Sequence, residues 1–313
     1  MRRRSAALVV VAAVHLLAAV AAVAVADPPT PPASPAQASL AAPDSSSSSG
    51  AFSPLQAPAP APLLLVSTPA PVPAPAQQPA AAVPRLVLEP LDGPPPWASQ
   101  PPQDYDECGG QRRQQRAAAE AVAEADAEGV TLDLVLYGDS ITRLFVRDGT
   151  FEARFGDWRA LALGMCGSSV AQLAWRILEG GERPAAAPRA AALLIGANNL
   201  LPLKGLEAPA GQLEWLVRWM RAAWPDTRVL VLGLLPIDWP DVDPQAVRDT
   251  NLQYAELAAR QGAAYLDCGQ GLDPTSEDQF VDGLHPTAQA QEAVLACLRD
   301  AVEPYLEGAG VAA

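Results

Sequence analysis

Short apolar runs alternate with longer amphipathic stretches in the C-terminal two thirds of the chain. The apolar runs occupy residues 132–138, 160–164, 191–196, 228–235 and 263–268. Such near-continuous apolar runs are typical of strands that are buried on both faces of a parallel sheet. The amphipathic stretches predict helices at residues 112–127, 170–178, 211–224, 245–261 and 287–306.

Alternating strands and helices predict an α/β fold, because parallel strands need helical crossovers. Five strands favour a three-layer α/β/α, flavodoxin-like arrangement with the parallel sheet order 2-1-3-4-5. Ligands of such folds bind at the carboxyl ends of the strands, where the strand order reverses. We therefore expect the loops after the first three strands to converge on one site.

The first 26 residues have the pattern of a targeting segment. Three arginines precede an uncharged apolar run that ends in Ala24-Val25-Ala26, a small-residue cleavage pattern. We interpret residues 1–26 as a signal peptide of a secreted or lumenal protein. The apolar run is also long enough to span a bilayer, so an uncleaved signal anchor remains open, and with it a membrane location.

Residues 27–103 hold 22 of the 33 prolines of the chain. Proline lacks an N–H group and fixes φ, so this stretch predicts a disordered stalk or linker without regular elements. Its Ala-Pro and serine-rich composition fits a glycosylated stalk and an unmodified linker equally well. Residues 104–313 contain the predicted strands and have the length of a single domain.

Composition excludes some classes of function. The formal net charge of −14 argues against a nucleic-acid partner, which needs clustered basic residues. Two histidines leave little room for a metal site, and we expect none. The four cysteines allow three complete disulfide pairings, and the sequence leaves the choice open: Cys108, Cys166, Cys268 and Cys297.

The predicted loops carry the residues of a nucleophilic site. Ser140 follows the first strand, and a serine needs a base that takes its proton. His15 lies in the leader, which makes His285 the sole candidate base of the domain. Asp282, three residues before it, is placed to hold the imidazole tautomer. Ser140 and Asp282 also suit helix caps, so these structural roles are alternatives.

Three groups are candidate donors to an oxyanion. They are the backbone N–H of Ser140, the backbone N–H of Gly167 after the second strand, and the side-chain amide of Asn198 after the third. Asn198 also suits a turn, and we expect Asp139 to hold the turn before Ser140. Leu200, Leu201 and Trp239 are predicted to border the acyl or alcohol pocket.

Four blocks in this order resemble the SGNH (GDSL-type) hydrolases. They are GDSIT at 138–142, the glycine at 167 before small polar residues, GANN at 196–199, and DGLHP at 282–286. The segments LVLYGDSIT, LAWRILEG, LLIGANNL and VLVLGLLP are similar to the branch of the platelet-activating-factor acetylhydrolase catalytic subunits, and the resemblance covers about residues 131–306. One departure is Ser168, since that branch carries an aspartate after the glycine.

The resemblance implies an SGNH hydrolase fold with Ser140 as nucleophile, His285 as base and Asp282 as its partner. It also implies an oxyanion hole of Ser140, Gly167 and Asn198, and no cofactor. We expect a serine esterase that cleaves short-chain, acetyl-type esters of a small molecule, glycan or lipid. The alternatives are a catalytically silent glycan-binding module and a wall-associated protein whose main function lies in the proline-rich region.

Overall fold

The computed structural model describes residues 93–102 and 109–308. Its sheet contains the five predicted strands, all parallel, in the order β2-β1-β3-β4-β5. The strands are β1 (Leu134–Gly138), β2 (Ala160–Gly164), β3 (Ala190–Leu194), β4 (Arg228–Leu232) and β5 (Ala264–Leu266). The predicted fold class and strand order are therefore confirmed.

Successive residues of each strand belong to two different hydrophobic clusters. In β1, Val135 and Tyr137 face one cluster, while Leu134 and Leu136 face the other. Each strand therefore has apolar neighbours on both faces, which explains why its sequence is a continuous apolar run and not an alternating one.

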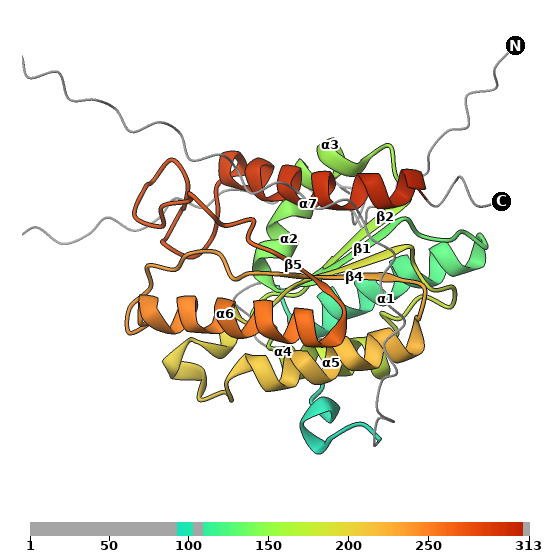
Figure 1. Ribbon diagram of the computed structural model, residues 1–313, viewed down its shortest axis with the longest axis horizontal. Helices are drawn as coiled ribbons and strands as arrows, with labels where there is room; N and C mark the ends of the chain where they lie inside the picture. Colours follow the sequence, from blue (N-terminus) through green and yellow to red (C-terminus); the bar gives the residue numbers. More distant parts are fainter. Residues whose placement is uncertain (1–92, 103–108, 309–313) are drawn as a thin grey trace, which may run out of the picture. The chain divides into compact units, whose positions relative to one another are not determined.

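Helices cover both faces of the sheet (Figure 1). One face carries α1 (Gln111–Ala127), α4 (Val170–Leu178), α5 (Pro209–Ala223) and α6 (Pro244–Gln261). The other carries α2 (Ser140–Arg147), α3 (Thr150–Phe155) and α7 (Ala288–Gly308). The helix α4 has the predicted bounds, whereas the six-residue helix α3 was not predicted.

Regular structure begins before the predicted domain boundary, which corrects one expectation. Residues Pro96–Ser99 form the short 3₁₀ helix η1, although residues 27–103 were expected to lack regular elements. Proline fits the first position of such a helix because its missing N–H would have no partner there. Trp97 packs edge-on against Trp215 of α5 at 5.5 Å between ring centroids, and Ala98 is fully buried.

The predicted signal peptide and most of the predicted stalk lie outside the described residues, so both remain predictions. Within the described residues, no helix is long and apolar enough to span a bilayer.

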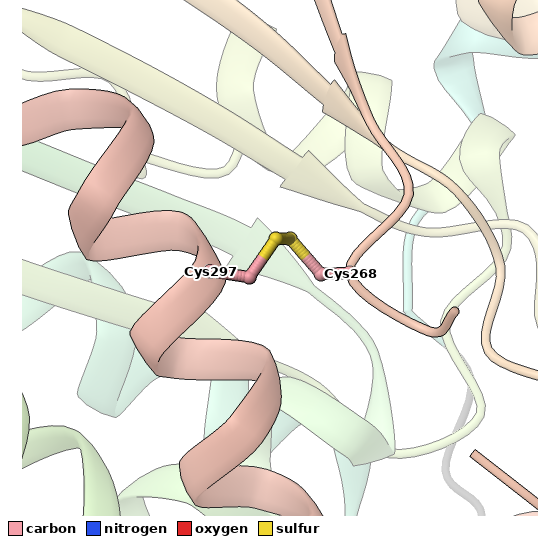
Figure 2. The surroundings of a disulfide bond; sticks show 2 residues. All are labelled: Cys268 and Cys297. Atoms are coloured by element: carbon pink, nitrogen blue, oxygen red, sulfur yellow. A yellow bond between two sulfur atoms is a disulfide. The ribbon is translucent and has the colours of Figure 1, made fainter. Parts of the chain in front are cut away.

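A disulfide bond joins Cys268, just after β5, to Cys297 of α7 (Figure 2). The Cα atoms of the two cysteines lie 5.6 Å apart. The enclosed segment contains Asp282 and His285, so the bond fixes both ends of the segment that carries two of the candidate residues. Cys166 is also disulfide-bonded, and Cys108 lies outside the described residues.

Replacing both Cys268 and Cys297 by serine should destabilise the protein. The bond closes a loop with a sequence separation of 29, and the chain-entropy model gives a loss of about 3–4 kcal/mol in the free energy of unfolding for this length. Urea denaturation followed by tryptophan fluorescence measures it. A double variant within about 0.5 kcal/mol of the wild type would show that the bond does not restrain the unfolded chain.

Candidate active site

Ser140 is the first residue of α2, and only Asp139 separates it from the end of β1. The carboxylate of Asp139 caps this helix by accepting a hydrogen bond from the backbone N–H of Ile141 at 2.9 Å. Asp139 thus holds the turn, as the sequence indicated. Ser140 is half-buried, and its hydroxyl lies at the N-terminal end of α2, where the helix dipole favours negative charge.

The structure brings Ser140, His285 and Asp282 together in a hydrogen-bonded chain. Nε2 of His285 lies 3.0 Å from Oγ of Ser140, and Nδ1 lies 2.7 Å from Oδ2 of Asp282. An ionised carboxylate can only accept, so the proton belongs on Nδ1 and Nε2 is left as an acceptor for the serine hydroxyl. The arrangement is that of a nucleophile, a base and a group that orients the base.

Asp282 holds its own loop as well as the imidazole. Its Oδ1 accepts from the backbone N–H groups of Leu284 and His285 at 3.1 and 2.8 Å. Partial burial would raise the pKa of Asp282, but the hydrogen bonds from His285 and the backbone outweigh it and hold the pKa below its usual value. Asp282 therefore stays ionised at neutral pH.

The loop of Asp282 and His285 is braced from the β4–α6 connection. The backbone N–H of Asp238 donates to the carbonyl of Gly283 at 2.8 Å. Gly283 has φ +78°, and a Cβ atom there would lie 2.0 Å from the Asp238 carbonyl oxygen. This position therefore requires glycine.

The second predicted loop turns at Gly167, whose φ of +71° is left-handed. Among the described residues, no acceptor is found for the backbone N–H groups of Gly167 and Ser140. Both groups are therefore available to a ligand. Two side chains of α1 hold the preceding residue: Gln111 Nε2 donates to the Cys166 carbonyl at 2.7 Å, and Gln114 Oε1 accepts from the Cys166 N–H at 2.8 Å.

Asn198 lies in the short helix η2 (Ala197–Asn199) after β3, next to the other two loops. Its Nδ2 donates to Oδ2 of Asp139 at 3.2 Å and to the carbonyl of Ser168 at 3.1 Å. Both protons of the amide thus have acceptors in the protein, and an oxyanion would have to share one of them. Asn198 joins the first and second loops in addition to its predicted role.

The Asp139 carboxyl has an unusual environment. Burial raises its pKa to about 6, although the Ile141 N–H, the nearby His285 and Lys204, and the Asn198 amide each lower it. The group therefore titrates just below neutral pH, where a carboxylate is ordinarily fully ionised.

A buried ion pair contacts the ends of β1 and β2, from which the first two loops of the site begin. Arg176 of α4 and Glu182 are both fully buried and form a two-pronged contact at 2.8 and 2.7 Å. Burial raises the pKa of Glu182, and the Arg176 charge limits that rise. The guanidinium also donates to the carbonyls of Gly138 and Leu163, at the ends of β1 and β2, at 2.8 and 2.6 Å.

Arg176 also contacts the second loop at Ser168. One of its N–H groups lies 3.3 Å from the Ser168 hydroxyl oxygen. The same guanidinium therefore contacts the end of β1, the end of β2 and the turn at Ser168. Sequence reasoning placed Arg176 in the LAWRILEG segment but gave it no role, because its partners come from β1, β2 and the turn at Glu182.

Leu200, Leu201 and Trp239 are partly buried and pack against the hydrophobic cluster on the α1 face. A cavity of about 370 Å³ beside the β4–α6 connection is lined by Ile237 and Asp238 but by none of these three residues. Their role in a substrate pocket remains a prediction. Among the described residues, no cluster of three or more histidine, cysteine or acidic side chains could hold a metal ion.

The chain belongs to the GDSL-like lipase/acylhydrolase family, whose profile matches residues 136–293. It is 32% identical over 170 residues to rat platelet-activating factor acetylhydrolase IB subunit alpha1, covering 51% of this chain and 71% of that protein. It is 28% identical over 192 residues to the chicken alpha2 subunit, covering 58% and 81%.

A solved structure from Streptococcus pneumonia, described by the words platelet activating factor, has the same fold. It matches with a TM-score of 0.50 and 20% identity, over 61% of this chain and 92% of that one. The predicted relationship to the SGNH hydrolases and to the acetylhydrolase subunits is thus confirmed.

Removing one member of the buried ion pair should be strongly destabilising. Arg176→Met leaves Glu182 buried without its partner, and such a change costs about 3–5 kcal/mol in the free energy of unfolding. Urea denaturation measures it, and the double variant Arg176→Met/Glu182→Gln should lose less than Arg176→Met alone.

The exposed pair of Arg260 and Glu214 provides a matched control. Arg260→Met removes the same charge at the surface and should cost at most about 1 kcal/mol. Equal losses in Arg176→Met and Arg260→Met would contradict the structural role assigned to the buried pair.

Proposed function

We propose that this family member is a serine esterase in which Ser140, His285 and Asp282 form the catalytic triad. The observation that carries the proposal is the 3.0 Å contact between Ser140 Oγ and His285 Nε2, with Asp282 on the other ring nitrogen. A histidine that is oriented in this way beside a serine hydroxyl is placed to remove its proton.

The reaction follows from these positions. Ser140 Oγ attacks the ester carbonyl carbon while His285 Nε2 takes its proton, and the negative charge develops on the carbonyl oxygen. The N–H groups of Ser140 and Gly167, with a proton shared by Asn198, stabilise this oxyanion. His285 then protonates the leaving alkoxide, and water releases the acyl group from Ser140 by the same steps.

The substrate we propose is a short-chain, acetyl-type ester. The matched relatives are named acetylhydrolases, which supports a small acyl group. The leader at residues 1–26 and the proline-rich residues 27–92 support a secreted or lumenal enzyme held on a tether. An exported esterase of this kind meets extracellular glycan or lipid esters.

Ser140→Ala should lower hydrolysis of p-nitrophenyl acetate by about 10⁴-fold or more, because the acyl-enzyme can no longer form. Ser276→Ala is the matched control, since Ser276 is half-buried like Ser140 and its side chain makes no hydrogen bond with the described residues. A fluorophosphonate probe should label Ser140 in the wild type, as read by mass spectrometry. Equal rates for the wild type and Ser140→Ala would exclude the esterase and favour a silent binding module.

Asn198→Ala should lower kcat by about 10²–10³-fold with little change in KM, as expected for a donor whose hydrogen bond strengthens in the transition state. Steady-state kinetics on p-nitrophenyl acetate measure both constants. A rise in KM at constant kcat would instead place Asn198 in ground-state binding.

A further inference from the structure

Lys204 belongs to the connection after β3 that carries Asn198, and it contacts the loop after β2 that carries Gly167. It is the only lysine of the chain and belongs to the short helix η3 (Pro202–Lys204), six residues after Asn198. Its ammonium donates to Oδ1 of Asn198 at 2.5 Å and to the carbonyl of Gly167 at 3.2 Å. One cation therefore bridges two loops that the sequence brings from different strands.

The contact with Lys204 fixes the orientation of the Asn198 amide. An ammonium can only donate, so the amide oxygen must face Lys204. The amide nitrogen then faces the Asp139 carboxylate and the Ser168 carbonyl, which accept. The opposite orientation would set an NH₂ group against the cation and an oxygen against the carboxylate, and both contacts would be repulsive.

The neutral amide of Asn198 lies between two opposite charges, those of Lys204 and Asp139. Lys204 stands at the oxygen end of Asn198, and the buried Asp139 stands at its nitrogen end. Hydrogen bonds in such a chain polarise one another, so the cation strengthens the amide as a donor. Asp139 caps the helix that begins with Ser140, and the network therefore reaches the residue beside the proposed nucleophile.

We propose that Lys204 is a positioning residue of the esterase, which holds the Asn198 amide and the Gly167 loop in the orientation that stabilises the oxyanion. The inference rests on the function proposed above. Lys204 acts through Asn198 and Gly167 and does not itself contact the substrate. Its effect should therefore fall on kcat and leave KM unchanged.

The test uses the full chain and p-nitrophenyl acetate. Lys204→Met should lower kcat by about tenfold to a hundredfold, which is less than the loss expected for deleting a donor. Lys204→Arg should recover much of the rate, because guanidinium is also a cation that only donates. Arg260→Met is the control for loss of one positive charge at a distant surface site. Thermal unfolding of each variant excludes a general loss of folding.

The decisive measurement is the same substitution in the Asn198→Ala background. If Lys204 acts through Asn198, Lys204→Met should lower kcat much less there than in the wild type. Equal losses in both backgrounds, or a change confined to KM, would overturn the proposal.

The pH profile gives a second readout that a merely structural role would not move. Among the described residues, the charges of His285 and Lys204 both lower the pKa of Asp139, and the buried phenol of Tyr254 lies near enough to be influenced by it. Without the Lys204 charge the pKa of Asp139 should rise above about 6. The ionised Asp139 accepts from the Asn198 amide, so its protonation should loosen that amide and lower kcat, and this loss should set in at higher pH in Lys204→Met and not in Lys204→Arg.

The two proposals fail in different ways. A wild-type rate equal to that of Ser140→Ala overturns the esterase and the role of Lys204 with it. A wild-type rate that depends on Ser140 but is unchanged in Lys204→Met overturns the role of Lys204 alone.

Discussion

The buried guanidinium of Arg176 is the constraint on which the arrangement of the site depends. It takes a position with no exposure to solvent, and there it must find a counter-charge and acceptors for its N–H groups. Glu182 supplies the charge, and the carbonyls that end β1 and β2 supply acceptors. Burying this charge costs free energy, which these contacts offset only when the ends of β1 and β2 and the Ser168 turn are correctly positioned around the guanidinium. This requirement fixes the spacing of two loops of the site.

The other loops of the site are held in place by contacts of different kinds. Asn199 holds the β3 loop to the start of α4 by accepting from the Val170 N–H at 3.1 Å. Asp238 holds the Asp282–His285 loop by its backbone, and the Cys268–Cys297 bond limits where that segment can go. The proposed triad thus lies on loops that are held to one another and to the neighbouring elements, with His285 Nε2 3.0 Å from Ser140 Oγ.

The sequence predicted what depends on local pattern and missed what depends on packing. Strand positions followed from double-sided burial, and the strand order followed from the alternation of five strands with helices. The blocks around Ser140, Gly167 and Asn198 marked the ends of β1, β2 and β3. The helix at Pro96–Ser99 was missed because its stability comes from Trp97 packing on Trp215, which is distant in sequence. Lys204 and Arg176 were missed for the same reason: each has one partner six residues away, but its other partners are the carbonyls of Gly167 for Lys204 and of Gly138 and Leu163 for Arg176, which the neighbouring sequence does not indicate.

Groups that favour negative charge lie next to the proposed oxyanion donors, although the whole chain is acidic. A net charge of −14 would disfavour a developing oxyanion if it acted uniformly, yet solvent screens charges beyond roughly 10 Å. Among the described residues, two features next to Asn198 and Gly167 favour negative charge: the Lys204 cation and the N-terminal end of α2. The opposing charges are Asp139 and Asp282. Asp139 is turned toward the Asn198 amide and the Ile141 N–H, and Asp282 is turned toward the imidazole of His285, and these donors stabilise the two carboxylates. An acidic protein can therefore maintain a site that stabilises an anion, provided that a cation such as Lys204 and N–H donors lie at the site itself.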